Sequence, residues 1–384
     1  MLILMLISNA FRPDPRALNE ARGLSSLGYR VIILAWDRAK EKPPLEVTDE
    51  HIRIIRIQSV PSRYGIGVRQ IWPLLRFWLA AVAYMHQLKP ELIHCHDFDS
   101  LPIGLVYAKM HRLPVIYDAR EYYADLIQPR LTGRLGKLLV KWVRFFETIC
   151  SRAASAVITV DETLAEIYKH KNKQVIIIGH YPPSRMALQP SQAFHHDQLR
   201  MIYVGRLSID RGMLLYPEIL RWLLKYGVPA HLRLIGVFTP EADKGQLLDR
   251  CVDLKPNLEI SDWVPYDEIP NILKEADLGL SILMPEPRYV AAVYVKLFDY
   301  MAAGLPTIAS NFPSVAKIIS EADCGILVDP LAPAEMIAAK IAELWSKPTT
   351  AKQMGENGRQ AILDRYNWES LNERLAGLYQ SLLR

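Results

Sequence analysis

The sequence predicts an α/β fold in which two doubly wound parallel sheets each form a domain. Short apolar runs alternate with helical stretches along the chain, which is the pattern of a parallel sheet with helices on both faces. The alternating series occurs twice, and 384 residues are enough for two domains of ordinary size. A polar, irregular stretch at 181–197 separates the two series and is expected to link the domains.

The first series begins with a strand at Leu2–Ser8 and a helix at Arg16–Leu27, which Gly28 ends. Its further strands are expected at Arg30–Ala35, Ile52–Ile57, Leu92–Cys95, Val115–Tyr117, Ala156–Val160 and Val175–Ile178. The strands of the second series are expected at Met201–Val204, His231–Ile235, Leu258–Ile260, Leu278–Leu283, Pro306–Ala309 and Ile326–Val328. Because ligands bind beyond the carboxyl ends of the strands in such sheets, we expect the site in a cleft between the domains.

Charge is divided unevenly along the chain. Residues 1–190 have 26 Lys and Arg against 17 Asp and Glu, whereas the remaining residues have 20 against 24. The excess in the first half predicts attraction to an anionic surface such as a membrane or a diphosphate. No recognised nucleic-acid motif accompanies the basic residues, so a nucleic acid is not expected as a partner.

The cysteines and the apolar runs indicate where the protein works. Cys95, Cys150, Cys251 and Cys324 are scattered without metal or redox spacing, which favours a reducing cytoplasm. No charge-free apolar run reaches the roughly 20 residues that a membrane span needs. The apolar start of the chain lacks a signal-peptide layout and is interpreted as a buried first strand.

The most informative segment of the second half is 295–310. It predicts a short amphipathic helix that Gly304 ends and Pro306 follows. Lys296 and Asp299 stand three residues apart and share one face of this helix. A cation for phosphate and a carboxylate for sugar hydroxyls, together at a sheet edge, suit a nucleotide sugar. The alternative from spacing alone is an ordinary surface ion pair.

Two arginines follow the first strand of the second series. Gly205 and Arg206 close this strand, and Arg211 and Gly212 are expected at the head of the next helix. The amino terminus of a helix offers unpaired N–H groups, and arginine adds bidentate contacts to phosphate oxygens. This arrangement predicts a diphosphate site, with a solvated loop as the alternative.

A set of short motifs recurs in a fixed order through the second half. They are Tyr203–Leu207, Asp210–Gly212, Leu234–Gly236, Trp263–Pro270, Ala276–Leu280, Val295–Ser310, Gly325–Pro330 and Tyr366–Trp368. This ordered set resembles the retaining glycosyltransferases of family 4 (glycosyl transferase group 1), which have the GT-B fold. The resemblance is strong from about Leu199 to the last residue and weaker before it.

The resemblance implies an acceptor-binding domain at 1–190, a donor-binding domain at 198–365 and a helix at 366–384 that returns to the first domain. It implies a hexosyltransferase that moves a sugar from a nucleotide diphosphate sugar to a hydroxyl of a glycan or lipid-linked acceptor, as in polysaccharide biosynthesis. No metal and no cofactor is expected. A nucleotide-sugar epimerase of the same fold and a catalytically silent nucleotide-sugar-binding protein are the alternatives.

The resemblance also assigns donor-binding residues. They are Gly205, Arg206, Arg211, Lys296, Leu297 and Asp299. Arg206 and Arg211 match the basic pair that holds the donor pyrophosphate in relatives, and Asp299 matches the second of two glutamates, which contacts the ribose. The first of these glutamates falls at Ala291, which indicates a variant donor pocket.

Polar clusters follow three strands of the first series and are expected to converge at one edge of the sheet. They are Ser8–Arg16, His94–Asp99 and Asp118–Tyr123. Alternation in a strand puts His94 and His96 on one face, which favours a structural role for His94 over a metal site. The Asp-x-Asp form at 97–99 is interpreted as coincidence.

The catalytic candidates are His96, Asp97, Arg120 and Glu121. Arg120 stands where relatives often have a histidine, and because it stays protonated it would stabilise the departing phosphate or position the acceptor. His96, Asp97 and Glu121 are candidates for polarising the acceptor hydroxyl. The usual proposal for retaining transferases is front-face attack, which needs positioning and charge stabilisation more than a strong base.

One helix of the first half has two readings. Arg134, Lys137, Lys141 and Arg144 fall on one arc of a helix over 134–149, and large apolar residues cover much of the opposite side. The helix either packs on the core with a solvated basic face or lies against a membrane interface beside anionic lipids. The resemblance favours the membrane, so the expected location is the cytoplasm, at the inner face of the membrane.

Overall fold

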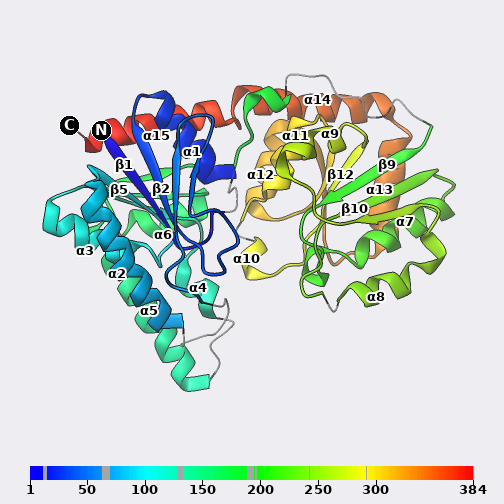
Figure 1. Ribbon diagram of the computed structural model, residues 1–384. Coiled ribbons are helices and arrows are strands. Elements are labelled where there is room, and N and C mark those ends of the chain that lie inside the picture. Colours follow the sequence, from blue (N-terminus) through cyan, green and yellow to red (C-terminus); the bar gives the residue numbers. More distant parts are fainter. Residues whose placement is uncertain are drawn as a thin grey trace. The chain divides into compact units, whose positions relative to one another are not determined.

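The computed structural model describes residues 1–11, 15–62, 70–128, 133–187, 194, 197–241, 243–290 and 292–383. The chain divides into two compact units: unit 1 is Met1–Gly179 with Leu371–Arg384, and unit 2 is His180–Ser370. Each unit is built around a sheet of parallel strands flanked by helices (Figure 1). The predicted α/β class with two parallel sheets is confirmed.

Unit 1 has an eight-stranded sheet in the order β3-β4-β2-β1-β5-β6-β7-β8. Its strands are β1 (Leu2–Ile7), β2 (Arg30–Trp36), β3 (Leu45–Val47), β4 (Arg53–Ile57), β5 (Leu92–His96), β6 (Val115–Ala119), β7 (Ala156–Thr159) and β8 (Val175–Ile177). All pairs are parallel except that of β3 with β4. In the middle of the sheet, Leu4 of β1 lies opposite Ile32 and Ile93. Every residue of β1 is buried, as expected of a central parallel strand covered on both faces.

The helices of unit 1 connect these strands, and the C-terminal helix joins them. They are α1 (Pro15–Ser26), α2 (Ile71–Leu88), α3 (Leu101–His111), α4 (Tyr123–Ile127), α5 (Gly133–Ala153), α6 (Glu162–Lys169) and α15 (Trp368–Leu382). From Leu371 onward α15 belongs to unit 1, as the GT-B expectation requires. A Cβ at Gly23 of α1 would stand 1.9 Å from the Oδ1 atom of Asn372, so this glycine lets the two helices approach closely.

Unit 2 has a six-stranded sheet in the order β11-β10-β9-β12-β13-β14, with every pair parallel. Its strands are β9 (Leu199–Val204), β10 (Ala230–Ile235), β11 (Leu258–Ser261), β12 (Leu278–Ser281), β13 (Thr307–Ser310) and β14 (Gly325–Val328). Its α-helices are α7 (Leu215–Lys225), α8 (Asp243–Arg250), α9 (Ile269–Leu273), α10 (Pro287–Val290), α11 (Val295–Ala302), α12 (Pro313–Ala322), α13 (Ala334–Trp345) and α14 (Pro348–Asp364). Its short 3₁₀ turns are η3 (Ser184–Ala187), η4 (Ile209–Arg211), η5 (Val252–Leu254) and η6 (Tyr266–Glu268).

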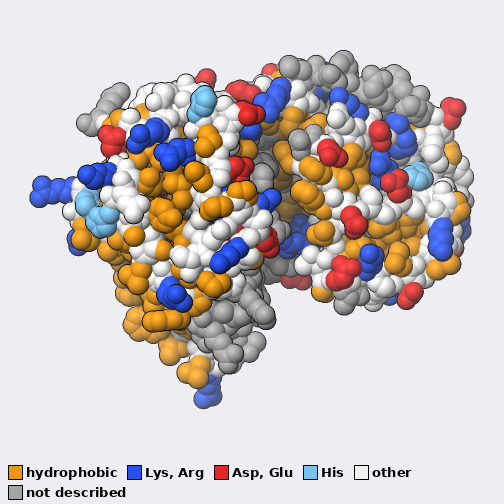
Figure 2. All heavy atoms as spheres, viewed as in Figure 1, with side chains coloured by type: hydrophobic (Ala, Val, Ile, Leu, Met, Phe, Trp, Pro, Cys, Tyr) orange, Lys and Arg blue, Asp and Glu red, His pale blue; other side chains and the backbone are white. Residues whose placement is uncertain are grey.

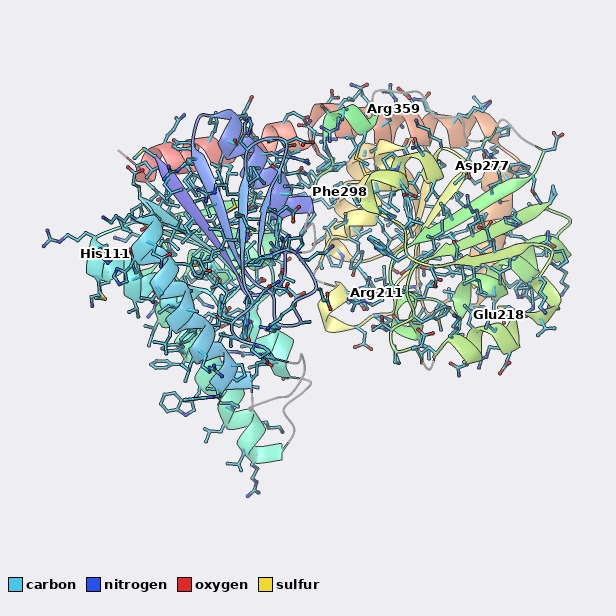
Figure 3. All side chains as sticks on the ribbon, viewed as in Figure 1. His111, Arg211, Glu218, Asp277, Phe298 and Arg359 are labelled. Atoms are coloured by element: carbon cyan, nitrogen blue, oxygen red, sulfur yellow. The ribbon has the colours of Figure 1, made fainter. Side chains whose placement is uncertain are left out.

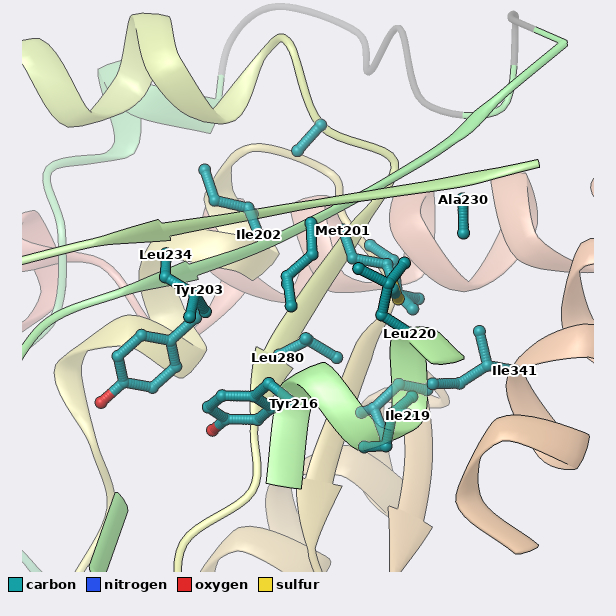
Figure 4. Packing of buried hydrophobic residues seen from close by; sticks show 14 of the residues in the cluster. Met201, Ile202, Tyr203, Tyr216, Ile219, Leu220, Ala230, Leu234, Leu280 and Ile341 are labelled. Carbon is teal, nitrogen blue, oxygen red and sulfur yellow. The ribbon is translucent and has the colours of Figure 1, made fainter. Parts of the chain in front are cut away.

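The core of unit 2 fills the space between β9, β10 and the helices α7 and α13 (Figure 4). Tyr203 of β9 and Tyr216 of α7 lie with their ring centroids 5.0 Å apart. Tyr216 is fully buried, and its hydroxyl donates to the carbonyl of Ile282 at 2.9 Å. This pairing anchors the first turn of α7 beneath the end of β12.

One local expectation is wrong. Arg211 and Gly212 do not head a helix: η4 ends at Arg211, the left-handed backbone of Gly212 (φ 78°) follows it, and α7 begins only at Leu215. In the stretch expected to link the domains, the ring centroid of Tyr181 lies 4.7 Å from that of Phe298 within unit 2. Residues 188–193 and 195–196 of that stretch lie outside the described residues.

Candidate functional site

Helix α11 positions the first group of candidate residues. Leu297, Phe298 and Met301 pack in the core as predicted, but Lys296 and Asp299 are buried as well, at 8% and 7% exposure. They are therefore not the surface ion pair of the alternative interpretation. The pattern suggested one exposed face, whereas neighbouring segments cover all sides of this helix.

Lys296 is a buried amine without a partner among the described residues. Its Nζ atom has no hydrogen-bond acceptor among the described residues and lies 3.6 Å from the centroid of the Tyr203 ring. Burial lowers the pKa of this amine well below its ordinary value, and the nearby Arg211 adds to the lowering. A buried amine without an acceptor is costly, which indicates that an anion belongs beside it.

Gly205 keeps the space next to this amine open. Its backbone has φ 139°, a conformation that other residues rarely adopt, and a Cβ there would stand 3.3 Å from Nζ of Lys296. A side chain at this position would crowd the amine. Glycine therefore allows a ligand to approach both the backbone of the strand end and Lys296.

Arg211, which is labelled in Figure 3, is held in place by a tyrosine. Its Nε atom donates to the hydroxyl of Tyr289 at 3.1 Å, and that hydroxyl donates to Asp210 Oδ2 at 2.7 Å. Arg211 thus has a fixed orientation, and it is near enough to Lys296 to lower the pKa of that amine. A guanidinium near an unpaired amine, which a bound anion would help to protonate, is suited to a diphosphate.

Asp299 is buried against Tyr266, whose hydroxyl donates to Asp299 Oδ1 at 2.8 Å. Burial raises the pKa of Asp299 to about 7, although the Tyr266 hydroxyl and the Lys296 amine act in the opposite direction. The carboxyl therefore changes its charge near neutral pH. The other carboxylate oxygen, Oδ2, could accept a hydrogen bond from a ligand hydroxyl.

This shift predicts how Asp299→Asn changes stability. Because the folded pKa of about 7 lies above the ordinary value near 4, the fold binds this proton more tightly than the unfolded chain, and stability falls as pH rises from about 4 to 7. The asparagine variant lacks this loss and keeps the Tyr266 contact. We expect its free energy of unfolding, measured by urea unfolding, to exceed that of the parent by on the order of 4 kcal/mol at pH 8, and to be nearly the same at pH 4. An equal difference at both pH values would contradict the assigned pKa.

Arg206 and Leu297, the other two donor-side candidates, have different surroundings from those of Lys296 and Asp299. Arg206 is exposed, and its carbonyl accepts a 2.7 Å hydrogen bond from the Tyr203 hydroxyl. The side chain of Leu297 packs in the core, and its backbone N–H donates to the carbonyl of Tyr294 at 3.0 Å. Ala291 lies outside the described residues.

In unit 1, polar side chains gather at the ends of β5 and β6. His96 Nδ1 lies 3.0 Å from Asp118 Oδ2 and 3.2 Å from a terminal nitrogen of Arg120. His94 and His96 stack with ring centroids 4.3 Å apart, which confirms that they share a face. The hydroxyl of Tyr379, from α15, lies 2.6 Å from Nδ1 of His94.

Arg16 ties this cluster to α1. Its guanidinium donates to Glu20 at 2.9 Å and to Asp118 at 2.5 Å, and all three side chains are buried. Burial by itself raises the pKa of Asp118, but Arg16, His96 and Arg120 together lower it far below its usual range. Burial and the neighbouring Asp118 raise the pKa of Glu20. Asp118 is therefore the permanent anion of the cluster.

Glu20, His94, His96 and Asp118 are a group whose ligand atoms could hold a metal ion. Oε2 of Glu20 lies 3.9 Å from Nε2 of both histidines. The guanidinium groups of Arg16 and Arg120 already lie against the carboxylates, so the anionic charge that would attract a cation is compensated. The cluster is better described as an ion-pair network than as a metal centre.

The remaining catalytic candidates lie at the rim of this network. Asp97 is half-buried and has a left-handed backbone (φ 64°), which is uncommon for a residue other than glycine. Burial raises the pKa of Asp97 to about 6, while the Arg120 guanidinium opposes that rise. Glu121, by contrast, is exposed. Three of the four candidates thus come together, and Glu121 does not.

Sequence reasoning missed several residues of both groups. On the donor side these are Tyr203, Asp210, Tyr266 and Tyr289, and in unit 1 they are Glu20 and Tyr379. One local signal was available: Arg16 and Glu20 stand four residues apart on the predicted first helix, a spacing that brings opposite charges together. The tyrosines contact residues distant in sequence and carry no such signal.

Comparison with known proteins places this geometry in a family. Residues 184–361 match the family model described as "Glycosyl transferases group 1", and residues 16–179 match "Glycosyltransferase Family 4". Together the two matches run through both units. They include Gly205, Lys296 and Asp299 on one side and His96 and Asp118 on the other.

Individual relatives have low sequence identity to the chain, but their alignments cover most of it. The chain is 23% identical over 299 residues to the GDP-mannose:cellobiosyl-diphosphopolyprenol alpha-mannosyltransferase of Komagataeibacter xylinus, covering 76% of this chain and 72% of that protein. Sucrose-phosphate synthase from Thermosynechococcus elongatus superposes with a TM-score of 0.79 at 19% identity, covering 100% of this chain and 99% of the other. The Anabaena protein HepE in complex with UDP has a TM-score of 0.70 at 14% identity, with full coverage of both chains. These structures confirm the GT-B fold.

Proposed function

Because the chain belongs to the family 4 glycosyltransferases of group 1, we propose that it is a retaining hexosyltransferase that uses a nucleotide diphosphate sugar. The transferred sugar would pass to a hydroxyl of a glycan or lipid-linked acceptor, as in polysaccharide biosynthesis. The similarity to a mannosyltransferase of a polyprenol-linked acceptor and to a UDP-bound structure supports this reading.

The observation that carries the proposal is the unpartnered amine of Lys296. It is buried between Gly205 and Tyr203, beside Arg211 and one turn from Asp299. An anion with two phosphates would compensate both cations, and the free oxygen of Asp299 would accept from a ribose hydroxyl. A nucleotide diphosphate sugar combines a diphosphate, the vicinal hydroxyls of a ribose and a transferable sugar.

The proposed reaction follows from these charges. The bond between the anomeric carbon and the donor phosphate oxygen breaks, a bond to the acceptor oxygen forms on the same face, and the hydroxyl proton passes to the departing phosphate oxygen. Lys296 and Arg211 stabilise the negative charge that develops on the leaving diphosphate. Arg120 and His96 are proposed to position the acceptor, and the reaction needs no metal in this proposal.

The four cysteines, all buried and unpaired, agree with a cytoplasmic location.

A thermal-shift screen tests the donor proposal. The protein is heated with UDP, GDP, ADP and their common sugar conjugates, with and without a chelator. We expect one diphosphate to raise the melting temperature at micromolar to millimolar concentration, unchanged by the chelator. No stabilisation by any nucleotide would contradict the donor site, and stabilisation lost with the chelator would contradict the metal-free reaction.

Product analysis then separates the alternatives. A retaining transferase releases the nucleotide diphosphate and transfers the sugar with retention of its anomeric configuration. Nuclear magnetic resonance of the product's anomeric proton detects that configuration. Conversion of the donor sugar into its epimer without an acceptor would support the epimerase. Binding without turnover in the presence of lipid-linked and free glycan acceptors would support the silent binding protein.

A further inference from the structure

Helix α5 of unit 1 has one face that packs on the core and a second, apolar face that does not. The core face contains Gly136, Val140, Glu147, Cys150 and Ser151. The second face consists of large apolar residues that are exposed, namely Leu135, Leu138, Trp142, Phe145, Phe146 and Ile149. Leu135 is 84% exposed and Trp142 62%. Packing on the core, one of the two readings of this helix, therefore does not account for these residues.

The exposed residues form a continuous stripe. At 100° per residue they fall within an arc of about 100° on the helix surface, away from the core face. The basic residues Arg134, Lys137, Lys141 and Arg144 lie on the adjoining arc and are exposed. The only carboxylate within α5, that of Glu147, is buried and accepts from Tyr117 and Tyr168. The solvent side of α5 is thus apolar along one strip and cationic along the next.

Helix α2 adds to this surface. Ile71, Trp72, Leu75 and Leu79 are exposed, with Trp72 at 69% and Leu79 at 73%. Figure 2 shows hydrophobic side chains gathered over the part of unit 1 where α2 and α5 run in Figure 1. We name the exposed apolar residues of α2 and α5, together with the basic strip of α5, the α2/α5 surface.

We propose that the α2/α5 surface docks unit 1 on a lipid bilayer that contains anionic lipids. Interfacial helices combine an apolar strip rich in Trp, Phe and Leu with Lys and Arg on the polar side, and α5 has both. Large apolar side chains left in water are costly, and a patch of this kind marks an interaction site.

Charge selects the bilayer over a protein as the partner. Lys137 and Lys141 have no ion-pair partner among the described residues, and Arg144 pairs with Asp125 of α4 at 2.7 Å. Free lysines beside a continuous apolar strip match a sheet of anionic headgroups over hydrocarbon.

Docking at the bilayer would bring unit 1 to a lipid-linked acceptor. Only this link to the acceptor rests on the proposed function. None of the helices in the described part of the chain could span a bilayer. Vesicle binding needs neither donor nor transfer, so a failure of docking and a failure of the donor site are distinguishable.

Vesicle flotation tests the inference with the full chain. We expect the protein to float with vesicles of phosphatidylcholine and phosphatidylglycerol, and much less with phosphatidylcholine alone. Trp142→Ser with Phe145→Ser should lower the partition coefficient by at least about tenfold. Lys137→Glu with Lys141→Glu should lower it by at least about tenfold on the anionic vesicles. All four side chains are exposed, so these variants are expected to fold.

The matched control replaces two apolar residues of similar exposure in unit 2. Leu331→Ser with Met336→Ser should leave the partition coefficient unchanged. An absence of binding to anionic vesicles, or an equal loss in the control, would overturn the proposal. So would sedimentation showing that the protein self-associates and that Trp142→Ser with Phe145→Ser abolishes the association without any vesicle binding, because the surface would then join two copies of the chain.

Discussion

Replacing Lys296 with methionine is expected to impair use of the donor strongly while making the unliganded protein more stable. The amine is buried without a hydrogen-bond acceptor, and burial lowers its pKa well below the ordinary value, so the fold holds it at a cost. Methionine has a similar volume and no polar atom. We expect the free energy of unfolding to rise by roughly 1–3 kcal/mol, since an unsatisfied buried polar group is removed.

The same change removes the charge that would stabilise the leaving diphosphate. Loss of one such group typically lowers the rate by about 10²–10³-fold, and we expect kcat/KM to fall by that amount. Urea unfolding and a steady-state transfer assay measure the two effects on the same preparation. Lys347→Met, at an exposed lysine paired with Glu343 in the same unit, serves as the control and should change neither quantity.

The direction of the stability change decides between a ligand site and a structural role. Replacing a lysine that supports the fold would lower the stability of the protein. A lower unfolding midpoint for Lys296→Met would therefore contradict the donor site. A gain in stability with a loss of activity is the pattern of a residue retained for its ligand.

Much of the fold could be predicted from sequence because parallel strands are short, apolar and buried on both faces. The predicted strands at 2–8, 30–35 and 92–95 agree with β1, β2 and β5 to within one residue at each end. Strand β3 was not predicted, since its three residues are exposed and form an antiparallel edge without an apolar pattern. A periodic apolar pattern arises where side chains are buried, and no residue of β3 is buried.

The candidate site could be predicted only in part. Lys296 and Asp299 were singled out by their chemical type and spacing, but their burial could not be inferred, because it is produced by segments such as Tyr203 and Tyr266 that lie far away in sequence. In α5 the sequence separates basic from apolar residues, yet no pattern within one helix distinguishes an apolar face in the core from an exposed one. Long-range contacts decide both cases.

A second large effect is expected in the ion-pair network of unit 1. Arg16→Met should lower the free energy of unfolding by roughly 3–5 kcal/mol at pH 7. Arg16 is buried and contacts both Glu20 and Asp118, so its removal leaves two carboxylates in the interior without their main cation. Urea unfolding followed by circular dichroism measures the loss. Arg22→Met on the same helix removes an exposed pair with Glu50 and should cost at most about 1 kcal/mol.

The pH dependence and a second substitution identify the cause. Asp118 has a lowered pKa in the fold, so its stabilising contribution is present above the ordinary value near 4 and is lost as pH falls below it. The difference between parent and Arg16→Met should therefore narrow below about pH 4. Adding Glu20→Gln to Arg16→Met removes one of the uncompensated carboxylates and should restore part of the stability. A loss that neither low pH nor Glu20→Gln reduces would come from the missing volume of the side chain, and the network would then be held by packing instead of charge.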